Sequence, residues 1–127
     1  MGFLGSIINN AKEKGERETQ SARIKILNAY DMRSASRTMH EAMKRSSSLA
    51  ARSALISCFQ SKIREESDMD GMYNAFEDMY KLYKRNGDTL AMNIAQMLGR
   101  KLHNKGDDRI REVDSSDKSI YVPSNYY

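Results

Sequence analysis

The feature that most constrains the fold is a stretch of 55 residues, between Gly15 and Gly71, that contains neither glycine nor proline. The only proline of the chain is Pro123, close to its end. Folds rich in β-hairpins place these residues at turns about every 8–12 residues. The sequence therefore predicts an all-α fold, a single-domain bundle of five or six helices.

Length and composition agree with that fold class. The chain has 127 residues, of which 39% are hydrophobic and 30% charged, values typical of one soluble domain. No apolar run approaches the roughly 20 residues that span a bilayer, and the single cysteine, Cys58, excludes an internal disulfide. No secretory leader pattern is present, so we expect a cytoplasmic protein that has no membrane partner.

The helix boundaries follow from capping residues. Residues 1–15 read as an amphipathic helix that Gly15 ends, and the next helix, over 16–32, would bury Ala22, Ile26, Ala29 and Tyr30. The apolar stripe that starts at Ala35 shifts after three serines at 46–48. This shift predicts a break, with Ser48 as the N-cap of a central helix that would bury Leu49, Ile56, Phe59 and Ile63.

That central helix also carries many small side chains, which would let another helix approach closely: Ala50, Ala51, Ser53, Ala54, Ser57, Cys58 and Ser61. Two further helices are expected at about 70–85 and 89–104, joined by Asn86-Gly87-Asp88, which supplies a C-terminal glycine and a new N-cap. The helical bundle should then occupy residues 1–106, and residues 107–127 should be an irregular tail, a small hairpin or a docking arm.

Both termini carry apolar side chains in segments too short to form a core of their own. Such groups are typical of protein-binding surfaces. The candidate protein-binding residues are Phe3, Leu4, Ile7, Ile8, Ile120, Tyr121, Val122, Tyr126 and Tyr127. At the N-terminus, Met1-Gly2-Phe3-Leu4-Gly5-Ser6 also matches a myristoylation pattern, and the alternative is that this first helix packs against protein.

Basic residues gather in the middle of the chain. Residues 23–64 contain nine Lys or Arg and only two acids. On a helix, Arg33, Arg37 and Lys44 would share one face, with Arg45 and Arg52 on the adjoining flank. Such a face could neutralise phosphates, so nucleic-acid binding is one hypothesis; a solvated face or a patch for an acidic protein is the other.

Residues 66–77, ESDMDGMYNAFE, resemble the calcium loop of the EF-hand family. The resemblance implies Glu66, Asp68, Asp70, Asn74 and Glu77 as oxygen ligands, with Gly71 at the turn. Glu66 stands where aspartate is usual, and Tyr73 stands where isoleucine is usual. The alternative is that these acids cap the helix that follows.

No constellation of catalytic residues is evident. His40-Glu41 begins like a zinc-protease helix, but Lys44 stands where the second histidine is needed. There is no glycine-rich phosphate loop. We therefore expect no enzyme and no cofactor. The sequence favours a protein-binding or assembly module, most simply a homo-oligomer, with a nucleic-acid-binding or a calcium-binding protein as alternatives.

Overall fold

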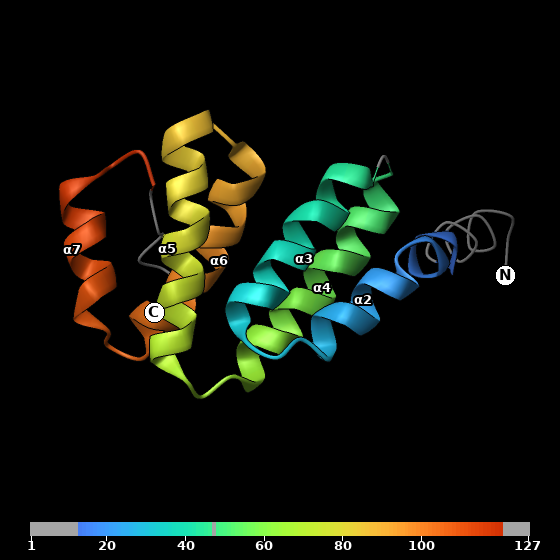
Figure 1. Cartoon of the computed structure of the whole chain (residues 1–127), viewed down its shortest axis with the longest axis horizontal. Helices are drawn as coiled ribbons and strands as arrows, with labels where there is room; N and C mark the ends of the chain where they lie inside the picture. Colours follow the sequence, from blue (N-terminus) through green and yellow to red (C-terminus); the bar gives the residue numbers. More distant parts are fainter. Residues whose placement is uncertain (1–12, 47, 121–127) are drawn as a thin grey trace, which may run out of the picture.

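The structure, a computed structural model, describes residues 13–46 and 48–120, and most of these residues are helical, with no strand among them (Figure 1). The all-α prediction is confirmed. Residues 13–18 are helical, and six further helices follow: α2 (Gln20–Leu27), α3 (Met32–Arg45), α4 (Leu49–Glu65), α5 (Met69–Asn86), α6 (Thr89–Asn104) and α7 (Asp108–Ser116). The described chain thus holds more helices than the five or six expected.

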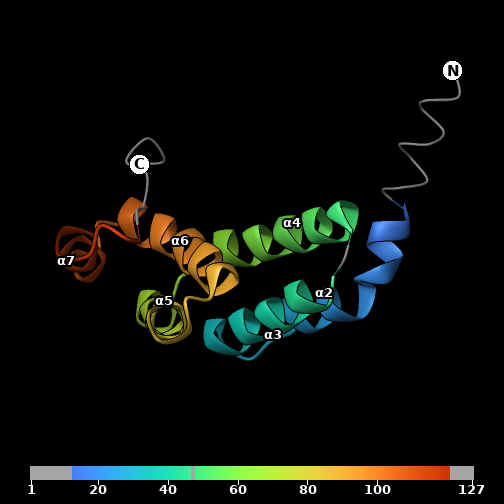
Figure 2. The ribbon, with the colours of Figure 1, turned by 90° about the horizontal axis from the view of Figure 1, so that it is seen from above.

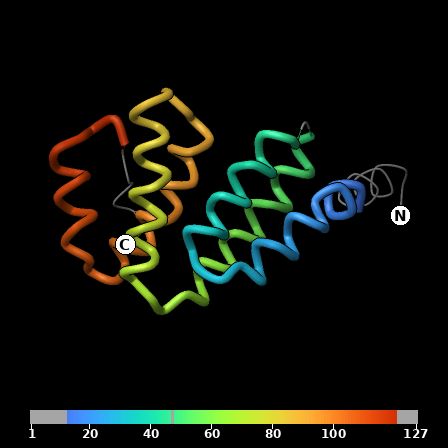
Figure 3. Tube along the Cα trace, in the orientation of Figure 1, coloured from blue at the N-terminus to red at the C-terminus, as the bar shows by residue number. Residues whose placement is uncertain are grey.

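Capping side chains define most of these boundaries. The break at the serines is confirmed, because the Ser48 hydroxyl accepts a hydrogen bond from the backbone N–H of Ala51 at 3.1 Å. The turn between α5 and α6 is also confirmed (Figure 3): Gly87 has the left-handed φ of 63°, and the Asp88 carboxylate accepts from the N–H of Ala91 at 3.0 Å.

Gly15 does not end a helix, contrary to the prediction. The helical residues 13–18 run through it, and Thr19 marks the change to α2. A Cβ at Gly15 would lie 2.7 Å from the carbonyl carbon of Ala50, so only glycine lets this segment cross the start of α4 so closely. Figure 2 shows this crossing at one end of α4.

The prediction of an irregular or hairpin tail beyond Gly106 is wrong for the described part. Residues 108–116 form α7, whose N-cap Asp107 accepts from the N–H of Arg109 at 3.0 Å. Ile110 is buried and Val113 packs against the core, so two residues three apart form the apolar face of this short helix.

One hydrophobic core joins α2–α4 to α5–α7. In α4 the buried stripe is Ala51, Leu55, Phe59 and Ile63, spaced four residues apart. Two residues predicted to be buried are instead exposed, Tyr30 at 98% and Leu49 at 82%. Ile26, Phe59 and Ile63 lie in the core as predicted, and Ile56 packs against it.

Candidate functional site

An apolar groove runs along the side of α4 that faces away from the core. It has a volume of about 820 Å³ and lies between α4 and the segment from Glu16 to Leu27. From α4 it is lined by Leu49, Ala50, Ser53, Ala54, Ser57, Cys58 and Ser61. Leu27 on the opposite wall is 49% exposed, so large apolar side chains stand open to solvent on both sides of the groove.

The small side chains of α4 explain why the groove exists. They lie on a different face from the buried stripe of Ala51, Leu55, Phe59 and Ile63, so α4 has two apolar faces. The sequence predicted that another helix approaches the small residues closely. Within the described residues this happens at Ala50, against Gly15, and the rest of that face lines the groove.

Two polar side chains line the groove, the Cys58 thiol and the Arg23 guanidinium. The Cys58 thiol donates to the backbone carbonyl of Arg23 at 3.6 Å, and burial raises the pKa of this thiol. The Nε of Arg23 is buried and has no hydrogen-bond partner among the described residues, although another nitrogen of the same guanidinium donates to the Glu16 carbonyl at 3.0 Å. A buried N–H without an acceptor costs free energy.

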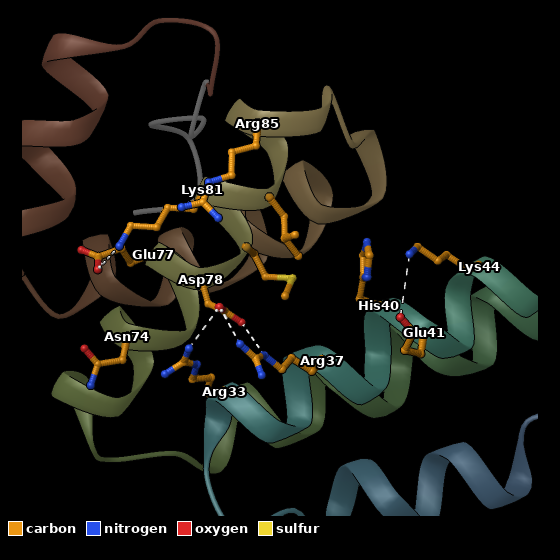
Figure 4. A pocket seen from close by; sticks show the side chains of 12 residues that line it. Arg33, Arg37, His40, Glu41, Lys44, Asn74, Glu77, Asp78, Lys81 and Arg85 are labelled. Atoms are coloured by element: carbon orange, nitrogen blue, oxygen red, sulfur yellow. Dashed lines mark hydrogen bonds and ion pairs between the residues drawn. The ribbon is translucent and has the colours of Figure 1, made fainter.

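A second hollow, of about 720 Å³, lies between α3 and α5 (Figure 4). It unites three predicted basic residues, Arg33, Arg37 and Lys44, with two that the sequence analysis missed, Lys81 and Arg85. The latter two come from α5, which the chain reaches only after α4, so periodicity within one helix could not reveal them.

Carboxylates neutralise much of this basic cleft. The Asp78 carboxylate accepts from Arg37 at 2.9 Å and pairs with Arg33 at 3.5 Å, and the Arg37 hydrogen bond, outweighing burial, lowers the pKa of Asp78. Lys81 pairs with Glu77 at 3.1 Å, and Lys44 lies 3.8 Å from Glu41. Five basic and three acidic side chains line the cleft, so its net charge is small.

The other two predicted basic residues lie elsewhere. Arg45 lines a hollow between α2 and α3, and the Nε of Arg52 donates to the carbonyl of Ser46 at 3.2 Å. Arg37 lines this hollow as well as the cleft, so the five basic residues lie around two adjoining hollows of α3. The acidic side chains beside Arg33, Arg37 and Lys44 interrupt the positive charge that a stripe tracking phosphates needs, and nucleic-acid binding stays an untested hypothesis.

The calcium-loop resemblance does not extend to the structure. α5 begins at Met69, so Asp70, Asn74 and Glu77 lie on a helix, where they cannot wrap round one ion as a loop does. Asp68 is the N-cap and accepts from the N–H of Gly71 at 3.1 Å, and Asp70 pairs with Arg109 at 3.1 Å. Glu66 is the C-cap of α4. The capping alternative is therefore correct for Asp68.

Of the predicted terminal residues, only Ile120 is described. It is fully buried in the chain's own core, so the prediction that it contacts a partner is wrong. Side chains of α5 also bind Asp117, which precedes Ile120. The Tyr80 hydroxyl donates to the Asp117 carboxylate, and Lys84 pairs with it at 3.1 Å. Burial, followed by the Asp117 bond, raises the pKa of Tyr80 to about 12. Outside the described residues lie Phe3, Leu4, Ile7, Ile8, Tyr121, Val122, Tyr126 and Tyr127.

Each histidine lies beside an aspartate carboxylate. The Nε2 of the buried His40 lies 2.8 Å from a carboxylate oxygen of Asp88, the residue that caps α6. His103 lies 3.9 Å from Asp114. Across 13–46 and 48–120, no three His, Cys, Asp or Glu side chains gather where they could hold a metal ion.

In the part of the chain that the structure describes, no helix has the length and apolar character to cross a membrane. Comparison of the chain with protein-family models, with curated proteins and with solved structures found no match, so its function has to be argued from its own geometry.

Proposed function

We propose that this chain is a small helical assembly module without catalytic activity, which binds protein through the groove along α4. Other copies of the chain are its first partner. The observation that carries the proposal is the exposure of Leu27 and Leu49 on the walls of an apolar groove whose floor consists of small side chains.

The shape and chemistry of the groove support a helical ligand. Small side chains let a second helix approach α4 closely, so that large apolar side chains of the ligand fill the hollow. Burying the apolar walls would stabilise the complex by about 25 cal/mol for each Å² removed from water. Scattered exposed apolar residues are common, but two of the four here, Leu27 and Leu49, line the same hollow.

The test compares two substitutions on α4 that add the same charge at exposed positions. Ser57→Arg places a guanidinium in the groove, whereas Gln60→Arg lies outside it. Sedimentation equilibrium at protein concentrations around 100 μM detects micromolar self-association. We expect an oligomer for the unmodified chain and for Gln60→Arg, and a monomer for Ser57→Arg, with equal helix content by circular dichroism in all three.

Two results would contradict the proposal. One is a monomeric mass for the unmodified chain over the whole concentration range. The other is an oligomer that Ser57→Arg leaves intact, since a charged side chain in the contact surface would weaken a groove-mediated complex by far more than one on the rim.

A further inference from the structure

We propose that the groove along α4 binds the N-terminal segment, residues 2–11, of a second copy of this chain, so that two copies exchange these segments. The inference rests on the proposed function, because it names the ligand of the same groove.

The position of the segment is the first argument. The described structure begins at residue 13, and Gly15 lies directly against Ala50. Ala50 and Leu49 form the end of the groove at the start of α4. Twelve residues outside the described structure are therefore attached at the groove itself.

The second argument is chemical fit. The spacing of Phe3, Leu4, Ile7, Ile8 and Ala11 predicts an apolar helix face. From Ala50 to Ser61 the groove follows α4 for about 17 Å, and a helix over residues 3–11 is about 12 Å long, at about 1.5 Å a residue. The large side chains of the segment would be complementary to the small side chains of the groove.

The third argument selects a second copy over the same chain. Residues 13–18 are helical, and in the sequence only Lys12 stands between them and the segment 2–11. Helix–helix connections that reverse direction take about 2–8 residues. A single residue does not let the segment turn back into its own groove. Exchange between two copies needs no such turn, and a two-fold arrangement fills both grooves at once.

Cys58, the only cysteine, lies in the groove and provides the test. Ile7→Cys places a thiol on the apolar face of the segment, whereas Asn9→Cys places one on the opposite face, about 200° away at 100° a residue. The variants are oxidised with glutathione disulfide at pH about 8.5, because only the thiolate exchanges. Non-reducing gels and mass spectrometry then identify the products.

We expect Ile7→Cys to form a disulfide with Cys58 between two chains, and the yield to be at least about tenfold that of Asn9→Cys, since a disulfide needs a Cα separation of about 4.4–6.8 Å. Adding Cys58→Ser should abolish this Cys58-linked dimer. A disulfide within one chain would overturn the exchange between copies. No disulfide, or equal yields from both variants, would overturn binding of the segment in the groove.

Deletion of residues 1–11 separates this inference from the proposed function. We expect the shortened chain to be monomeric, and a peptide of residues 1–12 to bind it but not to bind shortened Ser57→Arg. If the shortened chain still associates and Ser57→Arg still abolishes association, the groove binds another surface, and only the inference fails. If Ser57→Arg has no effect on either chain, the proposed function fails too.

Discussion

The two halves of the molecule differ in how completely their helices cover one another. From Met69 to Ile120, each large hydrophobic side chain is buried or half-buried. The exposed large hydrophobic residues of the described chain all lie in the first half: Ile24, Leu27, Tyr30 and Leu49. Two of them, Leu27 and Leu49, line the groove along α4.

The packing of the helices accounts for this difference. In the second half, α5 and α6 form an antiparallel pair, and α7 and Ile120 complete the core. In the first half, α4 buries one apolar face against the core and leaves the other open. The second half covers its own large apolar side chains, whereas the first half leaves Ile24, Leu27, Tyr30 and Leu49 exposed.

The largest effects on stability are expected from substitutions in the core that the two halves share, and these should show that the halves fold together. Phe59 of α4 and Phe76 of α5 are both buried in the one core. Phe59→Ala and Phe76→Ala should each lower the free energy of unfolding by about 3–5 kcal/mol. Urea unfolding followed by circular dichroism should remain a single transition in each case. If one half unfolds separately, the comparison describes two independent domains.

Substitutions of two glycines, one in each half, should have effects of intermediate size. Gly87→Ala forces alanine into the left-handed φ of 63° and should lower the free energy of unfolding by about 1–2 kcal/mol without changing association. Gly15→Ala places a Cβ 2.7 Å from the Ala50 backbone, so residues 13–18 must move away from α4. It should weaken association; equal masses for both variants would contradict this.

Acid should weaken the contacts that hold the end of the second half. Hydrogen bonds from Ser119 and Tyr80, with Lys84 nearby, lower the pKa of Asp117 well below its usual range. This stabilisation is therefore present at neutral pH and is lost as the pH falls below about 3.9 toward the lowered value. Asp117→Asn should be less stable than the unmodified chain at pH 7 and should lose less stability between pH 7 and acid, as measured by urea unfolding. Parallel pH profiles would show that Asp117 contributes nothing.

The smallest effects concern the start of α5. Asp68→Ala removes an N-cap and should cost about 1 kcal/mol. Calcium at about 1 mM should leave the melting temperature of the unmodified chain and of Glu77→Gln unchanged, because a true site would stabilise the folded state by mass action. A rise in the unmodified chain that Glu77→Gln abolishes would restore the calcium hypothesis.

Local signals predicted the helix boundaries well. Ser48, Asp68 and Asp88 cap helices as expected, because a cap depends on residues within one turn. α7 was missed because nine residues with few apolar side chains give a weak periodic signal. Gly15 was misread because its role depends on Ala50, which is distant in the sequence.

The site was predictable only in part. The small residues of α4 indicated a close approach to another helix, but periodicity does not say whether the chain itself provides that helix. For the same reason Leu49 and Tyr30 were assigned to the core and are exposed. The cleft between α3 and α5 needed the pairing of Asp78 with Arg33 and Arg37, which only the packing of two helices reveals.

The most direct test of the account is backbone hydrogen exchange of the unmodified chain, measured by mass spectrometry at low and at high protein concentration. We predict that residues 2–11 and 49–61 exchange more slowly at high concentration, because the segment and the groove cover each other. Residues 69–104 should exchange at the same rate at both concentrations. Concentration-dependent protection on α5 and α6 instead, or none anywhere, would contradict the claim that the first half is completed by a second copy.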